Sequence, residues 1–302
     1  MKVKVKYNNI IIKLIICLLL LLSTDYLLGK VADYCIQHQK SGDYFEFEYK
    51  VFHAQPDIAI LGSSRANHHY NTLLIDKELQ KKVINYGVDG SDILYDYIIL
   101  KTLIKHQVPQ IVILDVRPFE FEEKPSGQAV TYIFPFIKKL DITKSDLDII
   151  SPYEYIKVKL NTYRYNNIIL SVLANMRGKQ ESTASISGYV PLPSSGNIFK
   201  KDKVRFEKVN TASFHYFEAI ANLCKQNNIN LKVCISPYYN TITYNKAALL
   251  VKEFCNQKDI PFYDYSNSNF LVLNKSEFKD NLHLNATGAD RFTNDFIIRA
   301  LK

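Results

Sequence analysis

A short apolar segment, Ile111–Leu114, limits the fold of this chain more than any other part of its sequence, because it has no polar side chain to turn toward water. A strand that is apolar on both faces is buried on both, as in parallel sheets covered by helices. Other short apolar segments recur along the chain and alternate with stretches of helical periodicity. This alternation predicts an α/β fold, in which helices lie on both faces of a central parallel sheet.

The alternation continues through most of the chain. We expect strands over residues 56–61, 83–85, 110–114, 229–235 and 261–265, and helices over residues 92–106, 206–228, 246–257 and 286–301. Residues 118–205 show no clear period, and we expect an insertion or lid there. In sheets of this kind the ligand site lies at the carboxyl ends of the strands, so the residues that follow each strand are the first candidates for chemistry.

The N-terminus carries a separate apolar segment. Residues 10–28 contain only two charged side chains, Lys13 and Asp25, and these 19 residues are about enough to cross a bilayer core of roughly 30 Å. Three lysines precede the segment, which predicts a cytoplasmic N-terminus, and no small-residue cleavage site follows it. We therefore favour an uncleaved signal anchor over a cleaved signal peptide or a buried helix. The predicted organisation is a tail and transmembrane helix over residues 1–30, a juxtamembrane linker over 31–55 and an extracytoplasmic globular domain over 56–302.

The net charge of +8 is unevenly distributed. Four N-terminal lysines and a net charge of +5 over residues 121–205 account for the whole excess. The basic stretch either faces an anionic membrane, an anionic polymer or a partner, or is a solvated face without a specific role. An exported domain without a basic helix is a poor match to nucleic acid, so we expect none as a partner. The five cysteines form no C-x-x-C pair, which argues against a disulfide scaffold and against a structural zinc site.

The first candidate for chemistry is the Gly-Ser-Ser-Arg sequence at residues 62–65, which follows an expected strand and opens a helix. Ser64 at this turn would lie near the positive end of the helix, where a developing oxyanion is stabilised. Serine is also a preferred N-cap residue, and the motif alone fits that structural role. A second turn, Asn85–Gly90, follows the next strand, and its glycines let backbone N–H groups approach a ligand.

The third candidate lies just before the last expected helix. Asp280 precedes His283 by three residues, so its carboxylate can accept a hydrogen bond from one ring N–H and fix the tautomer. The other ring nitrogen is then free to take a proton from a serine. A serine early in the chain and an Asp–His pair late in it, each at the end of an expected strand, together predict a serine-based catalytic site.

The order of these motifs, Gly-x-Ser, Asn-x-Gly-x-x-Gly and Asp-x-x-His, resembles the SGNH/GDSL hydrolase superfamily over residues 56–302. The resemblance implies a three-layer α/β/α, flavodoxin-like fold and a Ser-His-Asp site that needs no metal or other cofactor. By position, Ser64 would be the nucleophile, His283 the general base and Asp280 the residue that orients it. The backbone N–H groups of Ser64 and Gly90 would line the oxyanion hole.

In one block the sequence departs from the superfamily. Residues 115–118 read Asp-Val-Arg-Pro where the superfamily has Gly-x-Asn-Asp, so Arg117 stands in the place of the oxyanion Asn. Arg117 either supplies a charged oxyanion donor or pairs with Asp115 or Glu120. Loss of one oxyanion donor can lower a rate by about 10²–10³-fold.

Four further residues lie close to these motifs. Arg65, beside the serine, either binds an acidic group of the substrate or has a structural role in capping the fold, and Asn85 is a candidate for substrate binding. His68 and His69 follow on the helix that Ser64 opens, and adjacent helical residues point roughly 100° apart, so at most one of them would face the site. We expect both histidines at the surface.

The signal anchor and the Gly-Ser-Ser block also resemble a narrower group, the membrane-tethered SGNH-like proteins of alginate O-acetylation and D-alanyl-lipoteichoic acid synthesis. This resemblance implies a single-pass membrane protein that works with a membrane-bound O-acyltransferase on an acylated glycan or ester by a ping-pong route. The predicted function is a serine acyl esterase or O-acyltransferase, with acetyl as the expected acyl group, acting on a cell-surface polysaccharide. The alternative is a non-catalytic glycan-binding or assembly protein, which the altered third block favours.

Overall fold

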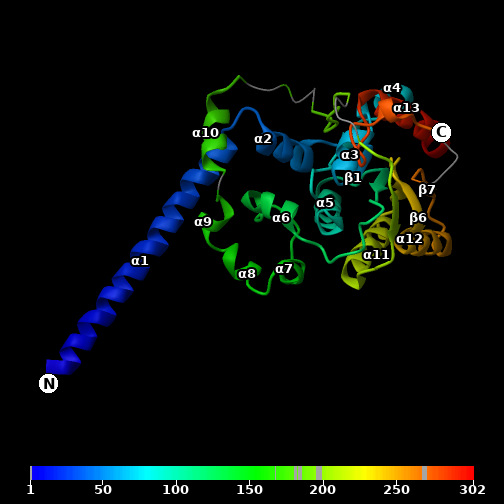
Figure 1. Cartoon of the computed structure of the whole chain (residues 1–302). Helices are drawn as coiled ribbons and strands as arrows, with labels where there is room; N and C mark the ends of the chain where they lie inside the picture. The colour runs from blue at the N-terminus through cyan, green and yellow to red at the C-terminus, as the bar shows by residue number, and fades with distance from the viewer. Residues whose placement is uncertain (1, 167, 180–181, 183–185, 195–198, 267–270) are drawn as a thin grey trace. The chain divides into compact units, whose positions relative to one another are not determined.

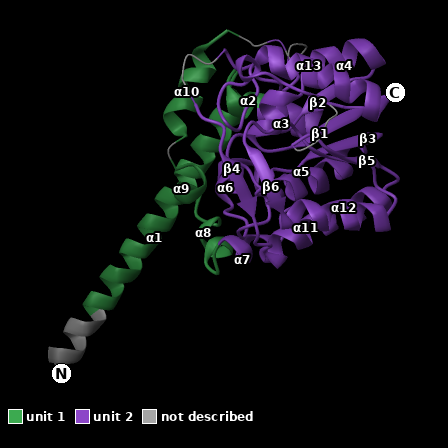
Figure 2. Ribbon diagram, turned by 45° about the vertical axis from the view of Figure 1, so that its right-hand side comes forward, with its two compact units in different colours: residues 1–46, 151–181 green, residues 47–150, 182–302 purple. Residues whose placement is uncertain are grey.

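The computed structural model describes residues 2–302 apart from 167, 180–181, 183–185, 195–198 and 267–270, with side chains from residue 9 onward. The chain divides into two compact units (Figure 2). Unit 1 comprises residues 1–46 and 151–181, and unit 2 comprises residues 47–150 and 182–302.

Among the described residues of unit 2, five strands form a parallel sheet in the order β2-β1-β3-β5-β7. The strands are β1 (Ile58–Gly62), β2 (Val83–Asn85), β3 (Ile111–Asp115), β5 (Asn230–Ile235) and β7 (Phe262–Asp264). Numbered within the sheet alone, this is the flavodoxin-like order 2-1-3-4-5. Every residue of β1 is buried, as its apolar sequence requires, and β1 pairs with β2 on one side and β3 on the other.

Helices cover both faces of this sheet (Figure 1). One layer consists of three helices, of which α13 (Ala286–Phe296) packs on the other two, α3 (Ser64–His69) and α4 (Thr72–Leu79). The other layer consists of α5 (Ile93–His106), α11 (Thr211–Gln226) and α12 (Lys246–Gln257). α13 continues as a π-helical turn, η5 (Ile297–Leu301), and a 3₁₀ turn, η4 (Lys275–Glu277), precedes it. The predicted three-layer α/β/α fold with a central parallel sheet is confirmed.

Two further strands lie outside the expected ones. β4 (Lys203–Phe206) pairs in parallel with β6 (Thr241–Asn245) as a separate small sheet. The helix that we expected over residues 206–228 therefore begins later, at Thr211. It begins there because the side chain of Asn210 accepts hydrogen bonds from the N–H groups of Ala212 and Ser213 and caps the helix.

The segment that interrupts the alternation is divided between the two units. In unit 2 it forms α6 (Gln128–Tyr132), η2 (Phe134–Phe136) and α7 (Lys144–Ile150). In unit 1 it forms α8 (Glu154–Lys157), α9 (Asn161–Arg164) and α10 (Ile169–Arg177).

Unit 1 also contains the long N-terminal helix α1 (Lys2–Gln37). Over Asn9–Gln37 this helix is long and apolar enough to cross a membrane, with a mean hydropathy of 2.3 in its most apolar window, a test that a signal sequence also passes. The residues that we expected to be a linker, 31–55, are helical over most of their length, since α1 runs on to Gln37 and two short helices follow it. These are α2 (Asp43–Glu48) and the π-helix η1 (Tyr49–His53).

Candidate active site

The turn between β1 and α3 places Ser64 at the carboxyl end of a strand. Gly62 in this turn has a φ of +139°, and a Cβ atom there would lie 2.7 Å from the carbonyl oxygen of Asp115. Only glycine fits both this backbone angle and this close approach. The strand therefore ends at Gly62, and helix α3 begins two residues later with Ser64.

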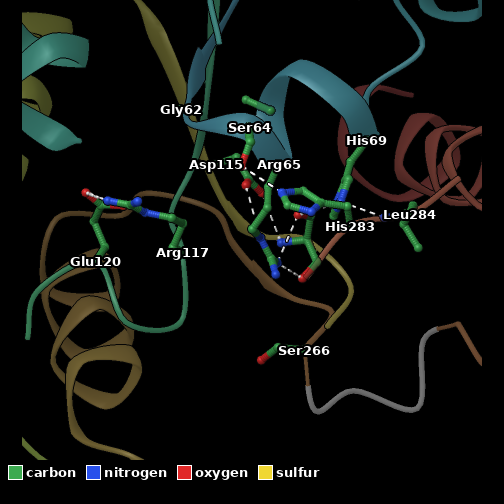
Figure 3. Close-up of polar contacts among 12 residues, drawn as sticks. Gly62, Ser64, Arg65, His69, Asp115, Arg117, Glu120, Ser266, His283 and Leu284 are labelled. Atoms are coloured by element: carbon green, nitrogen blue, oxygen red, sulfur yellow. Dashed lines mark hydrogen bonds and ion pairs between the residues drawn. The ribbon is translucent and has the colours of Figure 1, made fainter. Parts of the chain in front are cut away.

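Ser64, His283 and Asp280 form a hydrogen-bonded chain. The Oγ atom of Ser64 lies 2.8 Å from Nε2 of His283 (Figure 3). The Nδ1 atom of His283 lies 3.0 Å from each carboxylate oxygen of Asp280. Because an ionised carboxylate only accepts hydrogen bonds, Nδ1 carries the ring proton and Nε2 accepts the Ser64 hydroxyl. In this arrangement a histidine can withdraw the proton of the serine.

Asp280 is held by the backbone as well as by the histidine ring. Its Oδ1 accepts hydrogen bonds from the N–H groups of Leu282, at 2.7 Å, and His283, at 2.9 Å. Burial raises the pKa of this carboxyl, but the hydrogen bonds from His283 and from the backbone outweigh that effect and lower the pKa below its usual range. Asp280 is therefore ionised and oriented toward the ring.

A second histidine, His69, holds the backbone beside His283. It is fully buried, and its Nε2 accepts a hydrogen bond from the N–H of Leu284 at 3.0 Å. Its Nδ1 therefore carries the proton and donates to Oγ of Ser236, 2.9 Å away. Burial and the nearby charge of Arg65 lower the pKa of His69 well below its usual value, so the ring stays neutral. Our expectation of a surface position for His69 is wrong.

Arg65 belongs to the same buried network. Its side chain is 1% exposed, and Nη2 donates to the carbonyl oxygen of Ser236 and, at 3.0 Å, to its Oγ. Its Nε lies 3.7 Å from the carboxylate of Asp115, which also accepts from the hydroxyl of Tyr70 and the N–H of Ser236. The predicted substrate-binding role of Arg65 is corrected accordingly: the side chain is buried in the core, paired with Asp115.

Asn85 is likewise a core residue. It is completely buried, its Nδ2 donates to the carbonyl oxygen of Ala66 at 2.6 Å, and its Oδ1 accepts from the N–H of Gly87 at 2.9 Å. These bonds tie helix α3 to the turn after β2. Asn85 thus shapes the site from within and does not face a substrate, contrary to the prediction from the sequence.

His68 is also buried rather than at the surface, but its electrostatic state is opposite to that of His69. Its Nδ1 lies 2.7 Å from the carbonyl oxygen of Val190, and its Nε2 lies 3.1 Å from the carboxylate of Asp89. Both ring nitrogens face acceptors, which favours the doubly protonated ring. Burial alone would lower the pKa of His68, but the bonds to Asp89 and Val190 raise it above its usual value. The His68–Asp89 pair fastens the turn that contains Gly90 to α3.

The His68–Asp89 pair predicts a pH dependence of stability. Because the pKa of His68 is higher in the folded state than the unfolded value of 6.5, its contribution is complete below pH 6.5 and is lost as the pH rises through the folded-state pKa. Between about pH 6 and pH 9 we expect the free energy of unfolding to fall by about 1 kcal/mol or less, since the Asp89 side chain is 64% exposed. Urea unfolding of His68→Gln should show a flatter pH profile than that of His215→Gln, a variant at an exposed histidine. Equal profiles for the two variants would contradict this assignment.

The two remaining oxyanion candidates differ from each other. Gly90 has a φ of +75°, and no atom lies within 4 Å of the position that a Cβ would occupy, so this turn is open on that side. Arg117 instead donates from Nε and Nη2 to the carboxylate of Glu120, at 2.5 and 2.9 Å. Figure 3 shows this pair apart from Ser64 and His283. Of the two alternatives for Arg117, the structure has the pairing with Glu120.

A cavity of about 510 Å³ adjoins Gly90. Its walls include the Arg117–Glu120 pair, the rings of Phe119 and Phe206 and the carboxylate of Glu122. Most of the lining residues are polar, since Asp92, Glu123, Lys124, Ser126 and Gln128 also belong to the lining. Within the part of the chain that the structure describes, no group of three or more His, Cys, Asp or Glu side chains could hold a metal ion.

Similarity to known proteins is low. No family model matches the chain, and no curated protein matches it by sequence. Among solved structures, it is similar to the crystal structure of an acylhydrolase candidate from Bacteroides fragilis, with a TM-score of 0.42 and 12% sequence identity. The match covers 84% of this chain and 95% of that one. The chemistry of the site is therefore derived below from its own geometry.

Proposed function

We propose that the protein is a serine acyl esterase or O-acyltransferase of the SGNH type. The observation that supports the proposal is the hydrogen-bonded chain Ser64–His283–Asp280. Oγ of Ser64 lies 2.8 Å from Nε2 of His283, and Nδ1 of His283 lies 3.0 Å from the carboxylate of Asp280. A hydroxyl facing an imidazole nitrogen, whose tautomer is fixed by a carboxylate, is the arrangement that activates serine for nucleophilic acyl transfer.

In the proposed reaction, Oγ of Ser64 attacks the acyl carbonyl carbon while Nε2 of His283 takes the hydroxyl proton. Asp280 keeps the ring oriented and stabilises the imidazolium that forms. The negative charge on the carbonyl oxygen is stabilised by the backbone N–H groups of Ser64 and Gly90. Collapse of the tetrahedral intermediate expels the alcohol, which receives the proton from His283, and leaves an acyl ester on Ser64. Water or a sugar hydroxyl then attacks that ester by the same steps in reverse and takes the acyl group.

The proposed setting is the outer surface of a membrane. Residues 10–28 of α1 would cross the bilayer with the N-terminus in the cytoplasm, since lysines precede the apolar segment. An enzyme held in this way would meet cell-surface polysaccharide, with an acetyl ester as the proposed substrate and a membrane-bound O-acyltransferase as the proposed source of acyl groups.

The proposal is tested by covalent labelling of the full-length protein in detergent micelles with a fluorophosphonate probe, followed by mass spectrometry of the adduct. We expect the adduct on Ser64, its loss in Ser64→Ala and His283→Ala, and its retention in Ser63→Ala, which alters the adjacent serine. An acetyl ester offered together with a polysaccharide then separates transfer to the sugar from hydrolysis. If no labelling occurs while all variants remain folded, the site does not contain an activated serine.

One observation favours a second candidate function. The place of the oxyanion Asn is taken by Arg117, and this side chain is engaged with Glu120. A protein that binds glycans without acting on them would not need that donor. This candidate requires polysaccharide binding that is equal in the parent protein and in Ser64→Ala, together with an absence of labelling.

A further inference from the structure

Helix α9 of unit 1 is fastened to the second half of α1. The carboxylate of Asp25 accepts four hydrogen bonds, from the N–H groups and from the side chains of Asn161 and Thr162, at 2.7 to 3.0 Å. About two turns further along α1, Asp33 accepts a hydrogen bond from the hydroxyl of Tyr165. The first backbone N–H groups of α9, which have no partner within their own helix, are thus satisfied by a residue of α1.

The position of these contacts along α1 sets their depth in a bilayer. Gly29 lies against α9 so closely that a Cβ there would be 2.2 Å from Cγ of Asn161. At 1.5 Å per residue, Ile10 to Gly29 extends about 30 Å, which is the thickness of the hydrocarbon core. If the core begins at residue 10, Gly29 lies at its outer boundary and Asp25 about 6 Å inside it, so α9 lies at the outermost part of the core, next to the lipid headgroups.

The same segment exposes large apolar side chains. Those exposed by 41 to 82% are Tyr153, Ile156, Leu160, Leu170 and Leu173. Apolar side chains are exposed on α1 as well, not only in the first apolar run but on to Tyr34. Large apolar side chains exposed at several positions of one short segment are a candidate interaction surface.

We infer that residues 151–177, here called the collar, lie in the lipid headgroup region around α1. This inference rests on the membrane anchoring proposed above. Continuity with the spanning helix favours lipid as the occupant, because α9 is bonded to α1 at the depth where the hydrocarbon ends, and α10 continues outward from there to Lys40. The exposed tyrosines Tyr26, Tyr34, Tyr153 and Tyr155 agree, since tyrosine is enriched at membrane interfaces.

The net charge of the collar also favours lipid as its binding partner. Residues 151–177 contain four basic side chains and one acidic one, part of the basic excess seen in the sequence. A segment with apolar side chains and a net positive charge binds anionic lipid surfaces, with its apolar face about 5–10 Å into the boundary between headgroups and acyl chains. The collar would thus give the protein a second attachment to the membrane beside α1.

The test uses the full-length protein in vesicles of phosphatidylcholine and phosphatidylglycerol. Single cysteines replace Ile156, Leu170, Leu19 and Leu249 in a Cys17→Ser background, and each carries an environment-sensitive fluorophore; the other four native cysteines are buried. Lipids with nitroxides at different depths then locate each label. Leu249 on α12 is the matched control, because it is an apolar residue exposed by 56% outside the collar.

We expect the label at position 19 deep in the bilayer, the labels at 156 and 170 at a shallow depth of about 5–10 Å, and no quenching at 249. Unquenched labels at 156 and 170, with a deep label at 19, would overturn the collar and leave the anchoring intact. An unquenched label at 19 would reject the anchoring and the collar together. Neither result bears on the activity of Ser64, which is measured separately by covalent labelling.

Discussion

Replacement of His283 by alanine is expected to lower kcat for acetyl-ester cleavage by about 10⁴-fold or more, because the Ser64 hydroxyl then has no base to take its proton. The base lies 2.8 Å from that hydroxyl, and each of the other described histidines near the site has both ring nitrogens committed to other partners. His68 faces Val190 and Asp89, and His69 faces Ser236 and Leu284. Neither is therefore able to substitute for His283.

Asp280→Asn is expected to lower kcat to a similar degree, by about 10⁴-fold, because the amide presents an N–H to Nδ1 and favours the wrong tautomer. The measurement is steady-state hydrolysis of a small acetyl ester by the purified full-length variants, with circular dichroism to confirm folding. His215→Ala, at an exposed histidine of α11, is the control and should keep the parental kcat. Parental rates in both His283→Ala and Asp280→Asn would reject the proposed catalytic mechanism.

Asp115→Asn is expected to lower the free energy of unfolding by about 3–5 kcal/mol, because it leaves the guanidinium of Arg65 in the core without a counter-charge. Both side chains are essentially inaccessible, at 1% and 0% exposure. Burial raises the pKa of Asp115, and the positive charge of Arg65 offsets this rise only in part. The loss of hydration of the two charged groups therefore opposes folding, and their mutual attraction compensates for it. Removing one partner of a buried ion pair lowers the free energy of unfolding by more than the intact pair contributes to it, because the other charge stays buried and unpaired.

The same reasoning predicts a partial rescue. In the double variant Arg65→Met with Asp115→Asn, no charge is left buried, and much of the lost stability should return. Glu207→Gln, which breaks an ion pair with Arg205 between two exposed side chains, should change stability by less than about 1 kcal/mol. Urea unfolding followed by near-ultraviolet circular dichroism measures all three. A double variant no more stable than Asp115→Asn would show that the network holds the core by its hydrogen bonds rather than by charge.

Several elements follow from local sequence patterns alone. Strand β2 and helix α12 have the bounds expected from the sequence, and β1 and β3 lie within one or two residues of theirs. A short apolar segment without alternation, rich in β-branched residues, fits a strand buried on both faces, and helical periodicity predicts the buried side of each helix. The Asp280–His283 contact is equally local, since the two residues lie on one turn of the chain.

The polar side chains of the core could not be assigned from sequence, because residue type alone suggests a surface position for Arg65, His68, His69 and Asn85. Each is buried because a partner far away in the chain satisfies it, such as Ser236 for Arg65 and Val190 for His68. Of these partners, only Ser236 could have been suspected from the sequence, because it directly follows an apolar strand at the edge of the sheet where the site was expected. The structure shows Ser236 buried after the end of β5.

Sequence by itself therefore determined the fold class, the anchor-like helix and the identity of three residues suited to nucleophilic chemistry. Only the tertiary structure decided that Ser64 and His283, 219 residues apart, lie within hydrogen-bond distance, and that Arg117 turns to Glu120. Periodicity reports which face of an element is buried, and that is a local property. The distance between two side chains depends on the order of strands in the sheet and on the packing of α3 and α13 against it, which are long-range properties of the folded chain.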